Sequence, residues 1–242
     1  MAKDIVLAVA HLSRKFGGLT AVNDLSFDIR SNEIFGLIGP NGAGKSTTFN
    51  CVSGFYPPSS GKVMFFGEDI SSLSSHEISR RGLVRTFQHD SILSEMTVRD
   101  NLSIATFSHL RSRAERESRV VETAQVLRLD RHLDETAGTL PHGLQRMVSI
   151  AIAFATRPKL LCLDEPLTGL NQTEVSEAIA IFRRIRDEFG TAILLVEHNM
   201  KAVMEICDRI VVLDHGQFLA IGEPTQIKQD PAVISAYLGK RA

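Results

Sequence analysis

Hydrophobic and polar residues alternate along the first thirty positions of the chain. The apolar positions recur at every second residue, at Ile5, Leu7 and Val9 and then at Leu25, Phe27 and Ile29. A period of two is typical of strands with one buried face. The pattern therefore predicts two antiparallel strands joined through residues 15–18.

Short, continuous apolar runs follow and indicate strands that are buried on both faces. They lie at residues 34–38, 160–163, 193–196 and 210–213, with further short strands expected at 63–66 and 84–87. A helix is expected after the first run, at 45–53, and others at 174–189 and 201–207. Strand–helix alternation of this kind predicts a mostly parallel sheet in an α/β fold.

The stretch from residue 98 to 155 has few strand formers and carries charges at helical spacing. It predicts a helical subdomain inserted into the α/β core. We therefore expect a single domain over residues 1–242. Its core would comprise residues 1–90 and 156–242, and its helical subdomain about 91–155.

Composition narrows the classes of function. The 242 residues include 43% hydrophobic and 23% charged residues, an ordinary globular balance. The net charge of −1 offers no basic excess to neutralise phosphates, so a nucleic-acid partner is not expected. Three cysteines cannot all pair, which favours a reducing compartment.

No segment predicts export or insertion into a membrane. The first residues lack the apolar stretch of a signal peptide, and no apolar run approaches the ~20 residues that span a bilayer. If the protein serves a membrane, we expect it to be a peripheral subunit.

A phosphate-binding loop follows the buried strand at 34–38. Residues 39–46 match G-x-x-x-x-G-K-[ST], the P-loop pattern, between a strand and a helix. Glycines let backbone amides turn toward one anion, and the helix N-terminus adds partial positive charge. We expect Lys45 to reach the β- and γ-phosphates of ATP and Ser46 to bind Mg²⁺. The full set of predicted nucleotide contacts in this loop is Gly39, Asn41, Gly42, Ala43, Gly44, Lys45, Ser46 and Thr47.

Two acidic residues end the buried run at 160–163. Asp164 is expected at the carboxyl edge of the sheet, where the phosphate loop also opens, and could hold Mg²⁺. Glu165 follows with its side chain in a different direction, so it is expected to orient or deprotonate a water in line with the γ-phosphate.

Further motifs, in chain order, make the sequence similar to the ATPase subunits of ABC transporters, which share a P-loop core, an antiparallel β subdomain and a helical subdomain. Gln88 resembles the family's Q-loop glutamine, which contacts Mg²⁺ or the attacking water. Residues 140–146 stand at the signature motif, where Gly143 would approach the nucleotide of the opposite subunit. His198 resembles the switch histidine at the γ-phosphate, and Phe16 the aromatic residue that stacks on adenine.

Three positions depart from the family pattern. Pro141 replaces the signature serine, whose hydroxyl would reach the γ-phosphate, and Leu144 replaces a glutamine. Asn171 stands in the D-loop where aspartate is commoner. Because Lys45, Asp164, Glu165 and His198 are all present, we expect an active ATPase. The catalytic candidates are Lys45, Gln88, Glu165 and His198.

Within this family the chain most resembles the LivG-type ATPases of branched-chain amino acid importers. The segments that carry this resemblance are residues 16–22, 49–56, 84–88, 197–201 and 236–239. It implies a second ATPase subunit, identical or not, transmembrane permeases and, indirectly, an external substrate-binding protein. It also implies a place at the cytoplasmic face of the membrane. Two alternatives stay open for a working ATPase: a lipid or lipopolysaccharide system, and an ABC ATPase outside transport. A third is a nucleotide-binding regulator without turnover.

Overall fold

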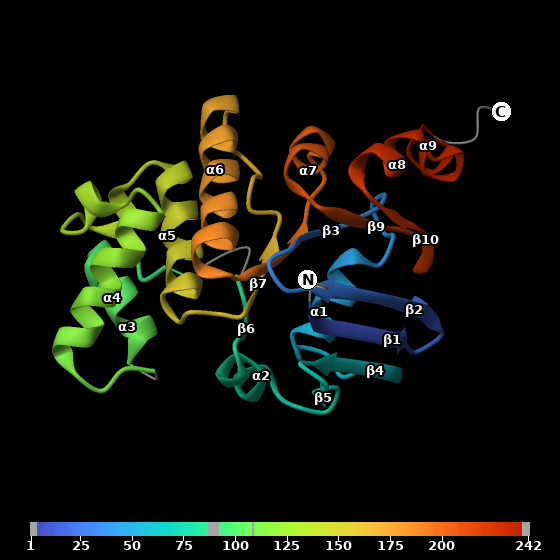
Figure 1. The fold of residues 1–242 in the computed structure, drawn as a ribbon, viewed down its shortest axis with the longest axis horizontal. Coiled ribbons are helices and arrows are strands. Elements are labelled where there is room, and N and C mark those ends of the chain that lie inside the picture. The colour runs from blue at the N-terminus through green and yellow to red at the C-terminus, as the bar shows by residue number, and fades with distance from the viewer. Residues whose placement is uncertain (1–3, 87–91, 108, 239–242) are drawn as a thin grey trace.

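Two β-sheets enclose helix α1 (Lys45–Val52), and most other helices cover the far face of the larger sheet (Figure 1). The structure is a computed structural model that describes residues 4–86, 92–107 and 109–238. Its layers follow from the sequence pattern: strands apolar on both faces need cover on both sides.

The smaller sheet is the predicted antiparallel one. Its strands are paired in the order β2-β1-β4-β5. They comprise β1 (Ile5–Phe16), β2 (Leu19–Arg30), β4 (Ser60–Phe65) and β5 (Glu68–Asp69). Phe16 pairs with Leu19, so the connection between β1 and β2 is reduced to two glycines. The predicted hairpin is confirmed.

The larger sheet has the strand order β10-β9-β3-β8-β7-β6. The pairs joining β6, β7, β8, β3 and β9 are all parallel, which confirms the predicted mostly parallel sheet. Its strands are β3 (Ile34–Ile38), β6 (Leu83–Arg85), β7 (Leu160–Asp164), β8 (Ala192–Val196), β9 (Arg209–Asp214) and β10 (Gln217–Gly222). β10 runs antiparallel to β9, and nothing in the hydrophobic pattern predicts it.

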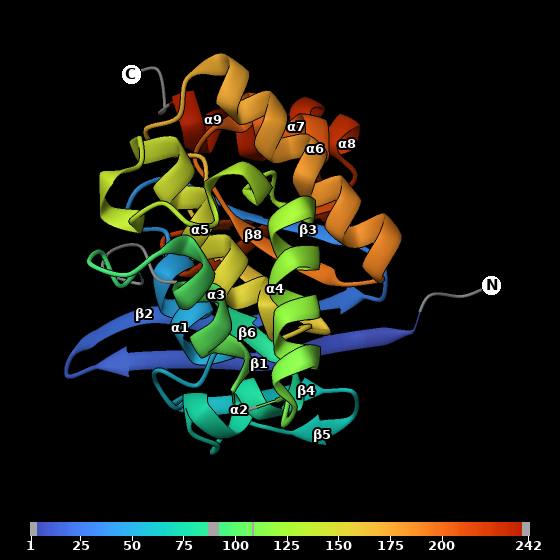
Figure 2. The same cartoon turned by 90° about the vertical axis from the view of Figure 1, so that its left-hand side faces the viewer.

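Residues 98–155 fold into the expected helical cluster, which lies to the left of the sheets in Figure 1 and in front of them in Figure 2. Its helices are α3 (Val98–Thr106), α4 (Arg113–Val126) and α5 (His142–Ala155). Their buried residues share one apolar core with the adjacent face of the larger sheet. The outer, charged face of α4 includes Glu117, which pairs with Arg99 of α3.

Side chains of β3 alternate between two cores. Ile34 and Ile38 pack on the side of the helical cluster, whereas Phe35 and Leu37 pack with α1 and the antiparallel sheet. Each core excludes water from one face of the strand, so both sets of positions must be apolar. This double burial explains why the segment appears in the sequence as a continuous apolar run.

Helix α6 (Gln172–Phe189) begins two residues before the predicted start at 174. Asn171 is its N-cap: its side chain accepts hydrogen bonds from the amides of Thr173 and Glu174. The Glu174 carboxylate accepts one in return from the Asn171 amide, which completes a capping box. Cap chemistry, rather than the apolar period, sets this boundary.

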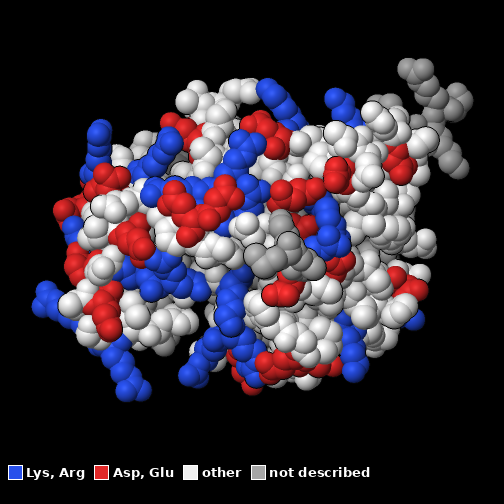
Figure 3. All heavy atoms as spheres, in the orientation of Figure 1, with Lys and Arg blue, Asp and Glu red and all other residues white. Residues whose placement is uncertain are grey.

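Four further α-helices complete the described part of the chain. They are α2 (Ser75–Arg81), α7 (Met200–Ile206), α8 (Pro224–Gln229) and α9 (Pro231–Leu238). None of the helices in the described part of the chain is long and apolar enough to cross a bilayer. Cys51, Cys162 and Cys207 are free and buried. Acidic and basic side chains are interspersed on the face shown in Figure 3.

Candidate nucleotide site

The loop between β3 and α1 has the backbone that the phosphate-binding pattern requires. Gly42 and Gly44 have φ values of 79° and 96°, in the left-handed region that favours glycine. Close packing adds a second constraint, because a Cβ at Gly44 would lie 2.6 Å from the carbonyl oxygen of Ala21. Gly44 is the N-cap of α1 and provides no side-chain cap, so the first amides of the helix are open to an anion.

Lys45 lies against this loop and is 9% exposed. Its Nζ donates hydrogen bonds to the carbonyl oxygens of Gly39 at 2.8 Å and Pro40 at 3.0 Å. Burial lowers the pKa of the ammonium group, while the charges of Glu165 and Asp164 act in the opposite direction. The carbonyl oxygens of the loop therefore hold a cation where it can neutralise the negative charge of a bound phosphate.

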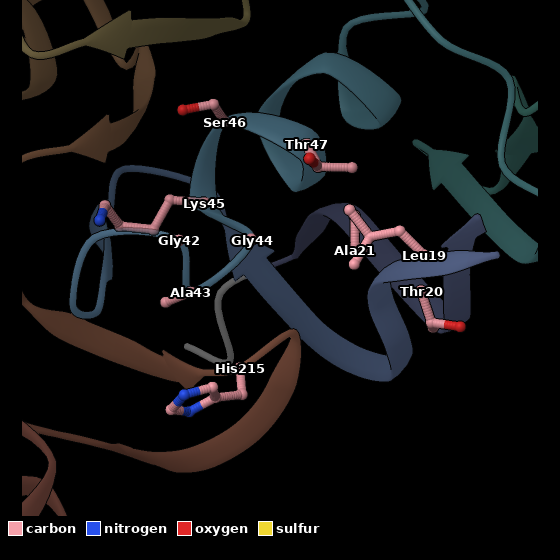
Figure 4. Close-up of a pocket in the computed structure, with 10 residues that line it drawn as sticks. All are labelled: Leu19, Thr20, Ala21, Gly42, Ala43, Gly44, Lys45, Ser46, Thr47 and His215. Atoms are coloured by element: carbon pink, nitrogen blue, oxygen red, sulfur yellow. The ribbon is translucent and has the colours of Figure 1, made fainter. Parts of the chain in front are cut away.

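A cavity of about 390 Å³ opens around the start of α1 (Figure 4). Such a volume lies within the range of small-molecule sites. Lys45 and Ser46 point to one side of the helix and Thr47 toward β2. The lining residues are Leu19, Thr20, Ala21, Gly42, Ala43, Gly44, Lys45, Ser46, Thr47 and His215. Most of the predicted loop residues therefore meet at one cavity.

Asp164 ends β7 at the carboxyl edge of the same sheet and is 6% exposed. Its Oδ1 is buried without a hydrogen-bond partner. Burial raises the pKa of this carboxyl; Arg85 opposes the rise and Glu165 adds to it. An orphaned, desolvated carboxylate oxygen fits the oxygen ligands of Mg²⁺. Asp164 and Ser46 are the residues that would hold the ion.

We predict that Asp164→Asn stabilises the protein. An acid whose pKa is higher in the folded state destabilises the fold as pH rises past its unfolded pKa, so ionised Asp164 lowers the free energy of unfolding at neutral pH. Removing the charge should raise Tm by about 2–4 °C, the shift that about 1 kcal/mol produces at this size. The added stability from Mg²⁺ and ATP should disappear. Thermal unfolding at pH 7 with and without both ligands measures it; an unchanged or lower ligand-free Tm contradicts it.

Glu165 and His198 lie close together, just after the carboxyl ends of β7 and β8. The Glu165 Oε1 is 3.8 Å from His198 Nδ1, and the carboxyl side chain is 33% exposed. Glu165 has a φ of 48°, and its amide donates to the Val196 carbonyl at 2.8 Å. Glu165 therefore lies in a left-handed turn directly after the end of β7.

The other predicted contacts are less central. Phe16 ends β1 and is 38% exposed; its ring packs edge-on against Tyr56, and the Arg14 guanidinium lies 4.6 Å from its centre. It is not among the residues that line the cavity, and neither is the exposed Asn41. Gln88 lies outside the described residues.

Gly143 belongs to the first turn of α5, away from the cavity lining. A Cβ there would lie 2.6 Å from the Glu174 carboxylate at the start of α6. Pro141 is the N-cap of α5 and makes no side-chain cap hydrogen bond, so the amides at this helix start stay open. Leu144 packs against the core that the helical cluster shares with the larger sheet, which explains why its side chain is apolar.

The structure also explains Asn171, which departs from the family pattern in the D-loop. Asn171 caps α6 through its side-chain oxygen, and asparagine and aspartate are comparably strong caps. Gly169 lies beside the His142 ring: a Cβ there would be 3.2 Å from Cε1. The D-loop and the signature segment are therefore in contact within one chain.

Four residues of the site region were given no role in the sequence analysis. His215, in the β9–β10 turn, lines the cavity. Burial raises the pKa of Tyr237 in α9 to about 12, against the opposing effect of the nearby Gly39 backbone. Arg146 donates a hydrogen bond to the Glu165 carbonyl, and Glu197 accepts one from the His198 amide. Arg146 is the last residue of the signature segment and Glu197 directly precedes His198, so their place in or beside these motifs was the available signal. No local pattern places His215 or Tyr237.

Family comparisons match two parts of the chain. Residues 22–168 match the family described as ABC transporter, and residues 219–242 the family described as branched-chain amino acid ATP-binding cassette transporter.

Individual relatives cover nearly the whole chain. It is 41% identical to the high-affinity branched-chain amino acid transport ATP-binding protein LivG of Escherichia coli K12, over 97% of this chain and 98% of the relative. The lipopolysaccharide export system ATP-binding protein LptB of the same organism is 35% identical, over 97% of each chain. Among solved structures, the ADP conformation of MJ1267, an ATP-binding cassette of an ABC transporter, superposes with a TM-score of 0.88 and 29% identity. The match covers 98% of this chain and 99% of that one.

Proposed function

Because the chain belongs to the ABC transporter family of ATP-binding proteins, we propose that it hydrolyses ATP to energise an importer of branched-chain or related amino acids. The observation that carries the proposal is the meeting of two elements at one sheet edge. The loop of residues 39–46 offers amides and Lys45 to a triphosphate. Asp164 ends β7, a strand of the same sheet as β3, and Glu165 follows it directly.

In the proposed reaction, Lys45, Ser46 and the loop amides hold the β- and γ-phosphates, and Thr47 lies near the α-phosphate. Glu165 accepts a proton from the attacking water. His198, 3.8 Å from Glu165, contacts the γ-phosphate. Mg²⁺ held by Ser46 and Asp164, with Gln88 as the expected third contact, would neutralise charge that develops on the phosphates.

The proposed working unit is a dimer in which each subunit contacts the other's nucleotide. Gly143 lies at an open helix start but not in its own subunit's cavity, which suits a contact made in trans. Two ATP molecules then join two subunits, and loss of the γ-phosphate lets them part. Only a ligand with different affinity for the two states can drive such a cycle.

We place the protein at the cytoplasmic face of a membrane through permease subunits, because its relatives are transport ATP-binding proteins. The amino-acid cargo rests on LivG and on the match at residues 219–242. The resemblance to LptB supports lipopolysaccharide transport less, since the identity is lower and the C-terminal match names branched-chain amino acids.

Phosphate release from the chain co-purified with its permeases tests the proposal. We expect leucine-loaded binding protein to accelerate release relative to the unloaded protein. A complex carrying Glu165→Gln is the background control. Release no higher than this control would refute hydrolysis. Stimulation by lipopolysaccharide and not by leucine would refute the cargo while leaving the ATPase in place.

A further inference from the structure

Glu197 is a buried carboxylate that the proposed mechanism does not use. It follows the end of β8 and is 1% exposed. Its Oε1 accepts a hydrogen bond from the Leu167 amide at 2.8 Å, and its Oε2 accepts from the amides of His198 at 3.0 Å and Asn199 at 3.2 Å. Three backbone donors on one carboxylate stabilise its charge.

These donors belong to two segments that carry catalytic candidates. Leu167 lies two residues after Glu165, at the start of the D-loop, and the other donor segment includes His198 itself. One side chain therefore fixes the backbones on both sides of the 3.8 Å contact between Glu165 and His198. Beyond the Glu165 amide, which still donates to the Val196 carbonyl at 2.8 Å, the two segments leave their strands as irregular backbone.

Arg146 of α5 holds the same region from the other side. Its Nη2 donates to the Glu165 carbonyl, and its Nε donates to the Pro166 carbonyl at 3.3 Å. Burial lowers the pKa of this guanidinium. The negative charge of Glu197 opposes that shift more strongly than the charges of Asp164 and Glu165 do. Arg146 lies one turn after Gly143, so the network links the start of α5 to Glu165.

We propose that Glu197, together with Arg146, is a positioning residue that holds the His198 and Glu165 backbones in register for the attack on the γ-phosphate. The inference rests on the proposed ATPase function and extends it. In this proposal Glu197 acts on the backbones of His198 and the D-loop and not directly on the substrate. Because its carboxylate is held by fixed amides, it keeps this geometry without moving during the cycle.

A second buried glutamate supplies a matched control. Glu33 is also 1% exposed, accepts a hydrogen bond from the Arg30 amide at 2.6 Å and lies 3.3 Å from Arg209. It precedes β3, at the amino edge of the parallel strands and opposite the site. If burial alone makes Glu197 important, Glu33→Gln should do as much damage to turnover.

The test replaces Glu197 by glutamine in the full chain. The carboxamide keeps one acceptor oxygen and presents an NH₂ group to a backbone amide, so one of the two segments loses its anchor. A displacement of about 1 Å at a catalytic group costs roughly 10²-fold. We expect kcat for ATP to fall about 10- to 100-fold, with the Kd for ATP within about twofold of wild type. Glu33→Gln should leave kcat at its wild-type value.

A double-mutant cycle with His198→Ala separates positioning from general damage. If Glu197 acts through His198, its substitution should slow the His198→Ala protein much less than it slows wild type. Additive losses, an unchanged kcat, or an equal loss of kcat and ATP affinity would each overturn the proposal. Should Glu197→Gln fail to fold, Arg146→Lys, which keeps the charge but loses the forked donors, must show the same kcat-selective loss. A wild-type protein without phosphate release would instead refute the proposed function.

Discussion

Replacing Glu165 by glutamine should reduce phosphate release about 10²–10⁴-fold while leaving ATP binding intact. Glutamine has nearly the same size but cannot accept the proton of the attacking water. The side chain lies at the sheet edge next to His198, so the change removes a charge without emptying a core. ATP should then persist in the site and hold two subunits together. Phosphate release and gel filtration with saturating ATP and Mg²⁺ measure the two effects.

A surface glutamate provides the control for this substitution. Glu188 is 53% exposed and pairs with Arg184 one turn away on α6. Glu188→Gln should leave both release and oligomeric state at wild-type values, since exposed ion pairs contribute about 0–1 kcal/mol. A Glu165→Gln protein that stays monomeric with saturating ATP would contradict the nucleotide-sandwich dimer. One that keeps wild-type release would contradict the role of Glu165.

Replacing Lys45 by alanine should weaken ATP binding about 10- to 150-fold, which corresponds to the 1.5–3 kcal/mol of a hydrogen bond to a charged group. The ammonium group lies within the loop that is expected to bind the phosphates, 2.8 Å from the Gly39 carbonyl oxygen. Isothermal titration with ATP and Mg²⁺ measures the loss of affinity.

Lys62→Ala is the matched control, because Lys62 is 66% exposed and pairs only weakly with Asp69, at 3.5 Å. It should bind ATP as wild type does. Thermal unfolding without ligand shows whether Lys45→Ala also disturbs the loop, since Lys45 donates to two of its carbonyls. An ATP affinity within twofold of wild type would refute the phosphate-loop assignment on which the other predictions depend.

Local patterns were sufficient wherever the cause of a feature is local. The continuous apolar runs identified β3, β7, β8 and β9, because a strand covered on both faces has no room for polar side chains. The run at 39–46 predicted the loop because only glycine adopts its left-handed turns without strain. The start of α6 was misplaced by two residues, although the Asn171 capping box that determines it was present in the sequence.

Contacts between distant segments were not predictable in this way. Strand order, the antiparallel β10 and the position of α1 between two sheets depend on which apolar surfaces meet. The placing of His215 and Tyr237 beside the phosphate loop has the same origin. Glu197 could be recognised as a neighbour of His198, but not as an acceptor for Leu167, thirty residues earlier.

The sequence by itself determined the chemistry of this protein: a phosphate loop, an acid pair at a strand end, and a chain of motifs shared with one family. These depend on residue types at fixed spacing, and such spacing is visible along the chain. The tertiary structure alone decided how Glu165 and His198 are held relative to each other. That geometry depends on buried hydrogen bonds from Glu197 and Arg146 to backbone groups of other segments, and backbone donors and acceptors are the same in every sequence.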